Sequence, residues 1–250
     1  MSSPSTDNLR GHRAKYEALT ASHPPDVAAN EFVGGGDPIH TGYVELELVR
    51  RFKAIEGAAI VDIGCGIGRL TRHLRHEPIA SYLGIDIIPE IMQAAVDGAE
   101  GDERFRFAIG EQCRIAQGDA TADVVVAFSV ITHLLDEECF EYFLEARRVL
   151  RPGGVALFSF LDFESPIHRP MFFTHARQHR LGHGDLLKFT TFGVLREFAV
   201  EAGFSRVDHV PGGEAIKTSG RTSPVMAPEK IPQTVALGQS LCVMTVPLAP

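Results

Sequence analysis

Short, almost uninterrupted apolar runs alternate along this chain with longer stretches in which apolar residues recur at helical spacing. Runs such as Ala58–Ile63 and Asp123–Ser129 are typical of parallel strands that are covered on both faces of a sheet. The longer stretches, such as the one with Val44, Leu48 and Phe52, predict amphipathic helices. The alternation therefore predicts an α/β fold, with a doubly wound sheet between layers of helices.

The same patterns place the individual elements. We expect strands at residues 58–63, 82–86, 105–109, 123–129, 155–160, 204–210 and 239–246. Helices are expected at residues 9–20, 41–52 and 190–202, with Thr41 as the N-cap of the second. The Ser-, Pro- and Thr-rich segment Met1–Asp7 predicts disorder, and Ser22–Gly42, with paired prolines and consecutive glycines, predicts a loop.

The chain divides into a cap and a main domain. An N-terminal cap of helices and loops is expected at residues 1–56, followed by the α/β domain at residues 57–250. Two insertions interrupt that domain, at residues 161–188 before the sixth strand and at residues 211–238 before the seventh. Long loops at the binding edge of a sheet usually carry function. We therefore expect a lid at residues 161–188, with substrate selectivity there and in residues 22–42.

The segment Val61–Arg69 carries the strongest chemical signal. An apolar strand that contains Asp62 runs directly into glycines at three alternate positions, Gly64, Gly66 and Gly68. Glycine removes side chains from a turn, so a ligand can approach the backbone and unusual backbone angles cost little. The spacing differs by one position from the dinucleotide fingerprint. The segment predicts a ligand-binding turn at the carboxyl end of the first strand.

Further strand ends continue this pattern. The second, third and fourth strands end in residues suited to contact a ligand, namely Asp86 and Ile87, Glu111 and Gln112, and Phe128 and Ser129. A Pro-Gly-Gly turn at residues 152–154 precedes the fifth strand. Because open α/β sheets bind ligands beyond the carboxyl ends of their strands, these residues are expected to converge on one crevice.

In order and spacing, these segments resemble the motifs of the class I S-adenosylmethionine (SAM)-dependent methyltransferases of the small-molecule type, over residues 58–161. The resemblance implies a Rossmann-like, mostly parallel seven-stranded sheet whose last strand is antiparallel. It also implies SAM as the cofactor and S-adenosylhomocysteine as the product. Asp62 would then orient the methionine part of SAM; a helix-capping or turn carboxylate is the alternative. The glycine turn would surround the cofactor through Gly64, Cys65, Gly66 and Gly68.

The resemblance also implies contacts for the rest of the cofactor. Asp86 would accept hydrogen bonds from the ribose hydroxyls, and Ile87 would offer an apolar surface to the adenine ring. Glu111 would contact the adenine amino group, together with Gln112. Two residues at the end of the fourth strand would complete the cofactor site, Phe128 and Ser129.

His133 is the residue expected to act as general base. It lies just past the fourth strand, where several small-molecule O-methyltransferases that this chain resembles carry a histidine. An imidazole titrates near neutral pH and can accept a hydroxyl proton. Asp162, just past the fifth strand, is expected to orient that imidazole from the neighbouring strand end. The alternative is that both residues only cap or pack.

The lid insertion contains a histidine series. His175, His179 and His183 are four residues apart, which would place them on one helical face. That spacing is compatible with a metal site, but no carboxylate or cysteine stands at ligand spacing beside it. Arg177 and Arg180 interleave with the histidines and favour a solvated cationic lid or an acidic substrate. We expect no metal.

Composition narrows the partners. The formal net charge is -8 and the sequence pI is about 5.8, which argues against nucleic acid as a partner. The Asn-Pro-Pro-aromatic motif of DNA amino-methyltransferases is absent after the fourth strand. The four cysteines are scattered, no secretory signal is visible, and no apolar run is long enough to span a bilayer. These features predict a soluble, cytoplasmic chain without a membrane partner.

The sequence thus predicts a SAM-dependent methyltransferase that acts on a small molecule, with a hydroxyl as the expected acceptor group. A nicotinamide-dependent oxidoreductase of the same fold class is one alternative, which the glycine spacing disfavours. A non-catalytic protein that binds SAM as a partner or scaffold is another. The oligomeric state is not readable from the sequence.

Overall fold

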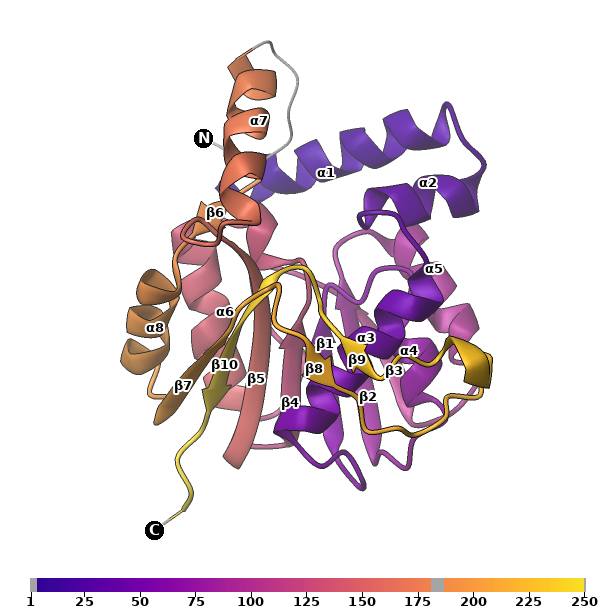
Figure 1. Cartoon of the computed structure of the whole chain (residues 1–250), viewed down its shortest axis with the longest axis vertical. Coiled ribbons are helices and arrows are strands. Elements are labelled where there is room, and N and C mark those ends of the chain that lie inside the picture. The colour runs from indigo at the N-terminus through magenta and orange to yellow at the C-terminus, as the bar shows by residue number, and fades with distance from the viewer. Residues whose placement is uncertain (1–3, 181–186, 250) are drawn as a thin grey trace.

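The computed structural model describes residues 4–180 and 187–249 (Figure 1). Of the segment Met1–Asp7, for which disorder is predicted, the structure describes the residues from Pro4 onward. His183 of the histidine series lies outside the described residues. From Pro4 to Asp7 the disorder prediction is wrong, because the first helix, α1, spans Pro4–Thr20.

A central sheet organises the molecule. Its strands are β1 (Ala59–Ile63), β2 (Ser81–Asp86), β3 (Phe105–Ile109), β4 (Ala122–Ala127), β5 (Leu150–Asp162), β7 (Arg206–Val210) and β10 (Ser240–Thr245). They lie in the order β3-β2-β1-β4-β5-β10-β7. The pairs formed by β1 to β5 are parallel, whereas β10 is antiparallel to both β5 and β7. The expected seven-stranded sheet with an antiparallel last strand is confirmed.

Shorter elements decorate this sheet. The two-residue strand β6 (Phe189–Thr190) pairs with the end of β5. Within the connection before β10, β8 (Ile216–Lys217) pairs with β9 (Thr234–Val235), and a 3₁₀ turn spans Pro228–Lys230. This connection is anchored on helix α3, where the carboxylate of Glu47 accepts hydrogen bonds from the backbone and hydroxyl of Ser219.

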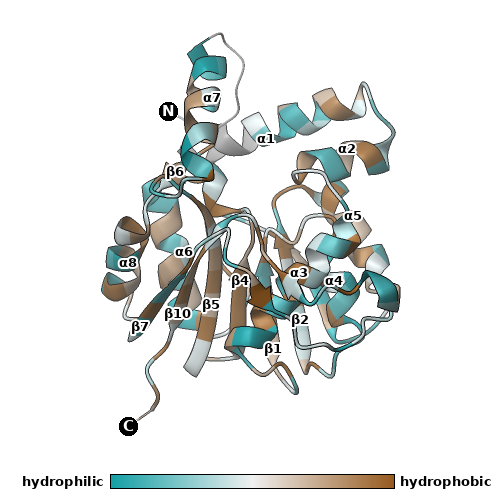
Figure 2. Cartoon of the chain, in the orientation of Figure 1, coloured by the Kyte–Doolittle hydropathy of each residue, from teal (hydrophilic) through white to brown (hydrophobic). Residues whose placement is uncertain are grey.

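Helices cover both faces of the sheet. The helices α3 (Pro38–Phe52), α4 (Arg69–Leu74) and α5 (Pro89–Gly98) contribute to one side. On the other side lie α6 (Asp136–Val149) and α8 (Phe192–Glu201). Since side chains alternate across a strand, Ile60 of β1 packs into the core with α3 and α4, whereas Val61 packs into the core with α6 and α8. Figure 2 shows the apolar strands between these layers.

The N-terminal region is more helical than its sequence predicts. The expected loop at Ser22–Gly42 contains helix α2 (Pro25–Phe32) and the first residues of α3. Pro25 and Pro38 occupy first-turn positions, where a missing N–H costs nothing. The N-cap of α3 is Asp37, not Thr41, because the Asp37 side chain accepts hydrogen bonds from the amides of Ile39 and His40.

The cap and the lid meet at one edge of the sheet. Apolar residues of α1 and α2 pack against Ile67, Ile88 and Ile91, which follow β1 and β2. Helix α7 (His168–Arg180) rises from the end of β5. Figure 1 shows α1, α2 and α7 above the same edge, which is the carboxyl edge of the parallel strands. Helices α1, α2 and α7 therefore stand beside the predicted binding edge, and their action as a cap and a lid stays a prediction.

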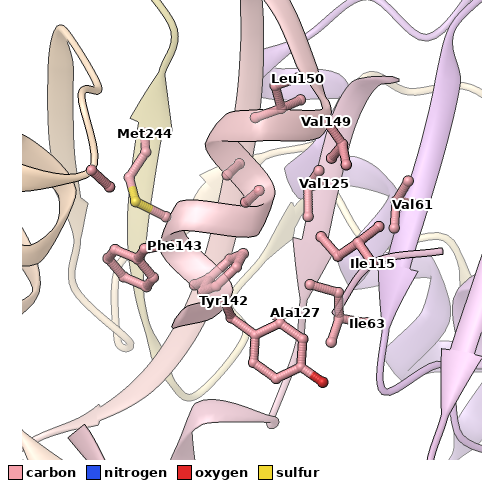
Figure 3. Packing of buried hydrophobic residues seen from close by; sticks show 14 of the residues in the cluster. Val61, Ile63, Ile115, Val125, Ala127, Tyr142, Phe143, Val149, Leu150 and Met244 are labelled. Atoms are coloured by element: carbon pink, nitrogen blue, oxygen red, sulfur yellow. The ribbon is translucent and has the colours of Figure 1, made fainter. Parts of the chain in front are cut away.

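Phe143 occupies the centre of the core beneath α6. Its side chain is fully buried and meets the ring of Phe158 edge to face, with 5.0 Å between ring centroids. Figure 3 shows it beside Met244 in this cluster. The next residue of α6, Leu144, is 44% exposed. The two neighbouring residues therefore offer a matched test of the core.

Replacing Phe143 by alanine should lower the free energy of unfolding by about 3–5 kcal/mol, because the residual cavity adds to the lost burial. The melting temperature should fall by about 10 °C for a domain of this size. Leu144→Ala should shift it far less, since little apolar surface is buried there. Equal shifts for both variants in thermal denaturation would contradict this packing.

Candidate functional site

A cavity of about 370 Å³ opens at the carboxyl edge of the sheet. Its floor is formed by the turn after β1, the end of β2 and the turn after β4. Residues of α1 and α2 form the opposite wall, and Met171 of α7 and Leu187 close one side. Most of the strand ends that the sequence singled out thus meet in one place, as the topology requires.

The glycine turn shapes the floor of the cavity. Gly64 and Gly66 line it, with φ angles of 69° and 52°. A Cβ atom on Gly64 would lie 2.4 Å from the Val130 side chain, so glycine is required there for space as well as for its backbone angle. Gly68 is outside the cavity wall; a Cβ on it would lie 2.7 Å from Ala95, so this glycine allows α4 and α5 to pack closely.

Asp86 ties this turn to the end of β2. One carboxylate oxygen accepts a hydrogen bond from the Gly66 amide at 2.9 Å, and the other accepts one from the Ile88 amide at 3.0 Å. A carboxylate has about four lone-pair positions, so further acceptor capacity remains toward the cavity, which Asp86 and Ile87 both line. Burial raises the pKa of Asp86, while the backbone amides oppose that rise.

Asp62 lies behind the cavity wall rather than in it. Its carboxylate accepts a hydrogen bond from the Tyr82 hydroxyl at 2.8 Å, and that hydroxyl also contacts Thr71 at 2.9 Å. Burial raises the pKa of Asp62 to about 8, and the Tyr82 hydrogen bond only partly offsets this. Its contact with the methionine part of a cofactor stays a prediction.

A second buried carboxylate lies nearby on α3. Glu45 faces the guanidinium of Arg69 at 3.1 Å, and burial raises the pKa of Glu45 to about 7 despite that cation. Arg69 also donates to the Val33 carbonyl at 3.3 Å. Arg69 and Val33 both line the cavity, so this arginine links the helix after the glycine turn to the end of α2.

The third strand end does not reach the cavity wall. Glu111 and Gln112 are exposed and follow β3 in a tight turn, with Glu111 bridged to Arg114. Tyr142 of α6 lines the cavity instead. It is 6% exposed, and within the described residues its hydroxyl has no hydrogen-bond partner. Figure 3 shows this residue at the margin of the core cluster. The sequence analysis missed Tyr142, whose ring lies on the core face of α6 and carries a polar hydroxyl.

His133 lies in the cavity wall, on a single 3₁₀ turn at Ile131–His133 after β4. Its ring stands edge to face against the ring of His12, with 5.2 Å between centroids. His12 and Lys15 of α1 also line the cavity. The cap therefore contributes basic side chains to the site, which the sequence did not identify because α1 is distant from the strand ends along the chain.

The structure corrects the partner expected for His133. The Asp162 carboxylate lies 3.3 Å from Nε2 of His209, and its other oxygen accepts from the Glu164 amide. Asp162 is buried and outside the cavity wall. His209 in turn stacks on Phe192, with 4.7 Å between ring centroids. Asp162 is therefore paired with β7, because the sheet order brings that strand and β10 to its side of β5.

The histidine series of the insertion is dispersed. Within the described residues, no group of three His, Cys, Asp or Glu side chains is placed to hold a metal ion. On α7, His175 is half-buried and His179 is exposed. His168 is fully buried: its Nδ1 accepts from the Asp162 amide at 2.9 Å, and its Nε2 lies 2.6 Å from the Gly238 carbonyl. This histidine fastens the start of α7 to the entry of β10.

Over residues 4–180 and 187–249, no helix combines the length and apolar character that crossing a membrane requires.

Comparison with known proteins relates this geometry to a family. Residues 60–154 match the family model of a methyltransferase domain. The chain is 30% identical over 134 residues to a ubiquinone biosynthesis O-methyltransferase of Azorhizobium caulinodans, which covers 50% of this chain and 52% of the relative. It is also 30% identical over 99 residues to the 2-methyl-6-phytyl-1,4-hydroquinone methyltransferase of Synechocystis, covering 40% and 30%. The chain thus spans about a third to a half of these curated relatives.

Solved structures share the fold at low identity. Phosphoethanolamine N-methyltransferase 1 of Haemonchus contortus, in complex with phosphoethanolamine and S-adenosylhomocysteine, superposes with a TM-score of 0.62 at 16% identity, over 97% of this chain and 50% of that one. A SAM-dependent methyltransferase from Methanosarcina mazei gives 0.57 at 16% identity, over 81% and 98%.

The buried Asp62 carboxyl should make the ligand-free chain less stable as pH rises. Its folded pKa of about 8 lies above the unfolded value, so its stabilising contribution is complete below about pH 4 and is lost as pH rises through 8. Urea unfolding at pH 5.5, 7 and 8.5 should show this fall, and Asp62→Asn should reduce its slope. Glu45 contributes in the same direction, so part of the slope will remain. An unchanged slope in Asp62→Asn, matching the exposed control Asp97→Asn, would contradict the assignment.

Proposed function

We propose that this chain, which belongs at residues 60–154 to the class I SAM-dependent methyltransferases, transfers a methyl group from SAM to a small molecule, at a hydroxyl. The observation that supports it best is the meeting, in one cavity, of the glycine turn, Asp86 and His133. The first two suit a nucleoside, and the third suits proton removal from an acceptor. SAM supplies a methyl group that its sulfonium charge already activates.

The cofactor fits the β1 and β2 side of the cavity. The remaining lone pairs of Asp86 would accept the two ribose hydroxyls, in addition to its backbone amides. Ile87 would face the adenine ring, and the Tyr142 hydroxyl offers the same half of the cavity a donor with no other partner among the described residues. The methionine part would pass along Gly64, Cys65 and Gly66, which remove or shorten the intervening side chains.

Residues that follow β3 and β4 would also contact the cofactor. Phe128 and Ser129 line the cavity after β4 and would border the methionine part through their backbone. Glu111 and Gln112 would reach the adenine amino group only after the exposed turn that holds them moves inward. Gly68 would act indirectly, by allowing α4 and α5 to pack behind the turn.

The acceptor would occupy the β4 and β5 side of the cavity. The cavity lining includes the apolar side chains of Leu134, Leu161, Met171 and Leu187 as well as His133. Such a wall favours an apolar or aromatic body that presents a single polar edge. One relative is named for O-methylation in ubiquinone biosynthesis and another for methylation of a phytyl hydroquinone, and both names agree with an acceptor of this general kind.

The chain's own residues then carry out a short sequence. The cavity walls align the acceptor oxygen with the methyl carbon and exclude water. The His133 imidazole accepts the hydroxyl proton as the oxygen–carbon bond forms and the carbon–sulfur bond breaks. The products are the methyl ether and S-adenosylhomocysteine, and His133 returns its proton to solvent. The adjacent His12 ring limits the positions that the imidazole can adopt.

The cofactor assignment is tested by calorimetry and thermal unfolding. SAM or S-adenosylhomocysteine at about a hundred times its dissociation constant should stabilise the chain by about 2.7 kcal/mol, whereas NAD and NADP should not. Asp86→Ala should weaken SAM binding about ten- to a hundredfold, because charge-assisted hydrogen bonds to the ribose are lost. Asp97→Ala, at an exposed carboxylate of α5, serves as the control. An unchanged SAM affinity in Asp86→Ala would contradict the placement of the ribose at Asp86.

His133→Ala should lower turnover about a hundredfold or more, the range expected for loss of a general base. The affinity for SAM should stay within about twofold of the wild type, since the imidazole faces the acceptor. His133→Gln keeps a polar side chain of similar size and should be equally slow. Full turnover in either variant would reduce His133 to a packing residue.

A further inference from the structure

Three polar side chains form a closed hydrogen-bonded ring at the ends of β4, β5 and β10. The Ser129 amide donates to Oγ of Ser159 at 2.7 Å. The Ser159 hydroxyl donates to Oε1 of Gln239 at 2.7 Å, and Nε2 of Gln239 donates to Oγ of Ser129 at 3.0 Å. Ser129 and Gln239 line the cavity, whereas Ser159 is fully buried behind them. We refer to these residues as the serine–glutamine ring.

The direction of each hydrogen bond in the ring is determined. An amide N–H can only donate, so the Ser159 oxygen accepts and its own proton must find an acceptor elsewhere. The carbonyl oxygen of Gln239 is that acceptor. The opposite orientation of the Gln239 amide would leave the Ser159 proton buried without a partner, which is costly. Gln239 therefore presents its N–H to Ser129.

The hydroxyl proton of Ser129 is not used by the hydrogen bonds of the ring. The Ser129 oxygen already accepts from Gln239, and within the described residues its hydroxyl makes no other hydrogen bond. Since Ser129 lines the cavity, the uncommitted O–H is available to a ligand there. Ser129 also has a φ angle of 62°, a conformation that non-glycine residues rarely adopt. The ring fixes the position of Ser129, and it leaves the Ser129 hydroxyl as a donor, before any ligand binds.

The hydroxyl lies on the acceptor side of the site. Its partners belong to β5 and to the entry of β10, which follow β4 in the sheet order, whereas Asp86 belongs to β2 on the other side of β1. Ser129 also shares one compact turn with His133: the His133 amide donates to the Val130 carbonyl, and the Thr132 hydroxyl donates to the Ser129 carbonyl. A donor and the proposed base therefore rise from the same turn.

We propose that Ser129 is a specificity-determining donor, held by the serine–glutamine ring, which selects acceptors with a second oxygen on the carbon next to the methylated hydroxyl. His133 takes the proton of one oxygen while Ser129 donates to a lone pair of its neighbour. The acceptor class is thus a hydroxyl adjacent to a phenolic or carbonyl oxygen on an apolar framework. This inference rests on the proposed methyl transfer.

The test compares catechol and 2-hydroxyacetophenone with phenol as methyl acceptors of the full chain. The wild type should prefer both oxygen-bearing compounds by about tenfold in kcat/KM, the value of one well-placed hydrogen bond. Gln239→Glu replaces the N–H by an acceptor oxygen, so the Ser129 proton turns to the new carboxylate. The preference for 2-hydroxyacetophenone, whose ketone can only accept, should then fall to within about twofold. Catechol should retain part of its preference, because its second hydroxyl can also donate.

Ser159→Ala provides a second variant that does not touch the cavity. It opens the ring, frees the Gln239 amide to turn, and should raise KM for 2-hydroxyacetophenone several-fold more than it raises KM for phenol. Equal use of phenol by the wild type would overturn the inference, as would a loss of SAM affinity in these variants with acceptor KM unchanged. A wild type that binds SAM but methylates none of the three compounds would overturn it and leave the cofactor site standing. A wild type that binds neither SAM nor S-adenosylhomocysteine would instead remove the proposed function.

Discussion

The carboxylate of Asp86 is the contact on which the geometry of the site depends. By accepting from the amides of Gly66 and Ile88, it joins the turn after β1 to the turn after β2. Two chain reversals that approach the same edge would otherwise present unpaired amides to each other and to the cavity. The glycines make this closeness possible, since a side chain on Gly64 would collide with Val130. The floor of the cavity is therefore built by backbone groups around one acid.

The layer behind that floor places unusual demands on the fold. Asp62 and Glu45 are carboxylates in an environment that favours their neutral forms, and among the described residues Tyr82 and Arg69 partly offset the cost of their burial. Arg69 also holds the end of α2 through the Val33 carbonyl. Through Arg69, helix α4 thus connects the buried acids, the glycine turn and the cap. Because Arg69 contacts both Glu45 and the Val33 carbonyl, a change in the charge of Glu45 would also affect the contact of Arg69 with the end of α2.

On the β4 and β5 side of the cavity, polar groups that line it are positioned by buried residues behind the wall. Ser159 is buried, yet it determines which way the Gln239 amide faces and hence what Ser129 offers to the cavity. His168 fastens the neighbouring Gly238 to the end of β5. The antiparallel strand β10, inserted between β5 and β7, is what brings Gln239 to this place. Selectivity would then depend on the last strand as much as on the lid.

Local patterns in the sequence determined the sheet, its parallel strands and the glycine turn with Asp86, because apolar runs, strand-end acids and glycine spacing are encoded over a few residues. They did not reveal α2, which begins at a proline pair that reads equally well as a loop. Nor did they reveal that Asp162 pairs with His209, that Tyr142 reaches the cavity, or that His12 lies against His133. Each of these contacts joins residues from different elements, and which elements become neighbours is decided only when the strands take their order and the cap folds over them. The sequence by itself thus determined the strand-end residues on the β1 and β2 side of the cavity, and the tertiary structure decided which groups face its β4 and β5 side.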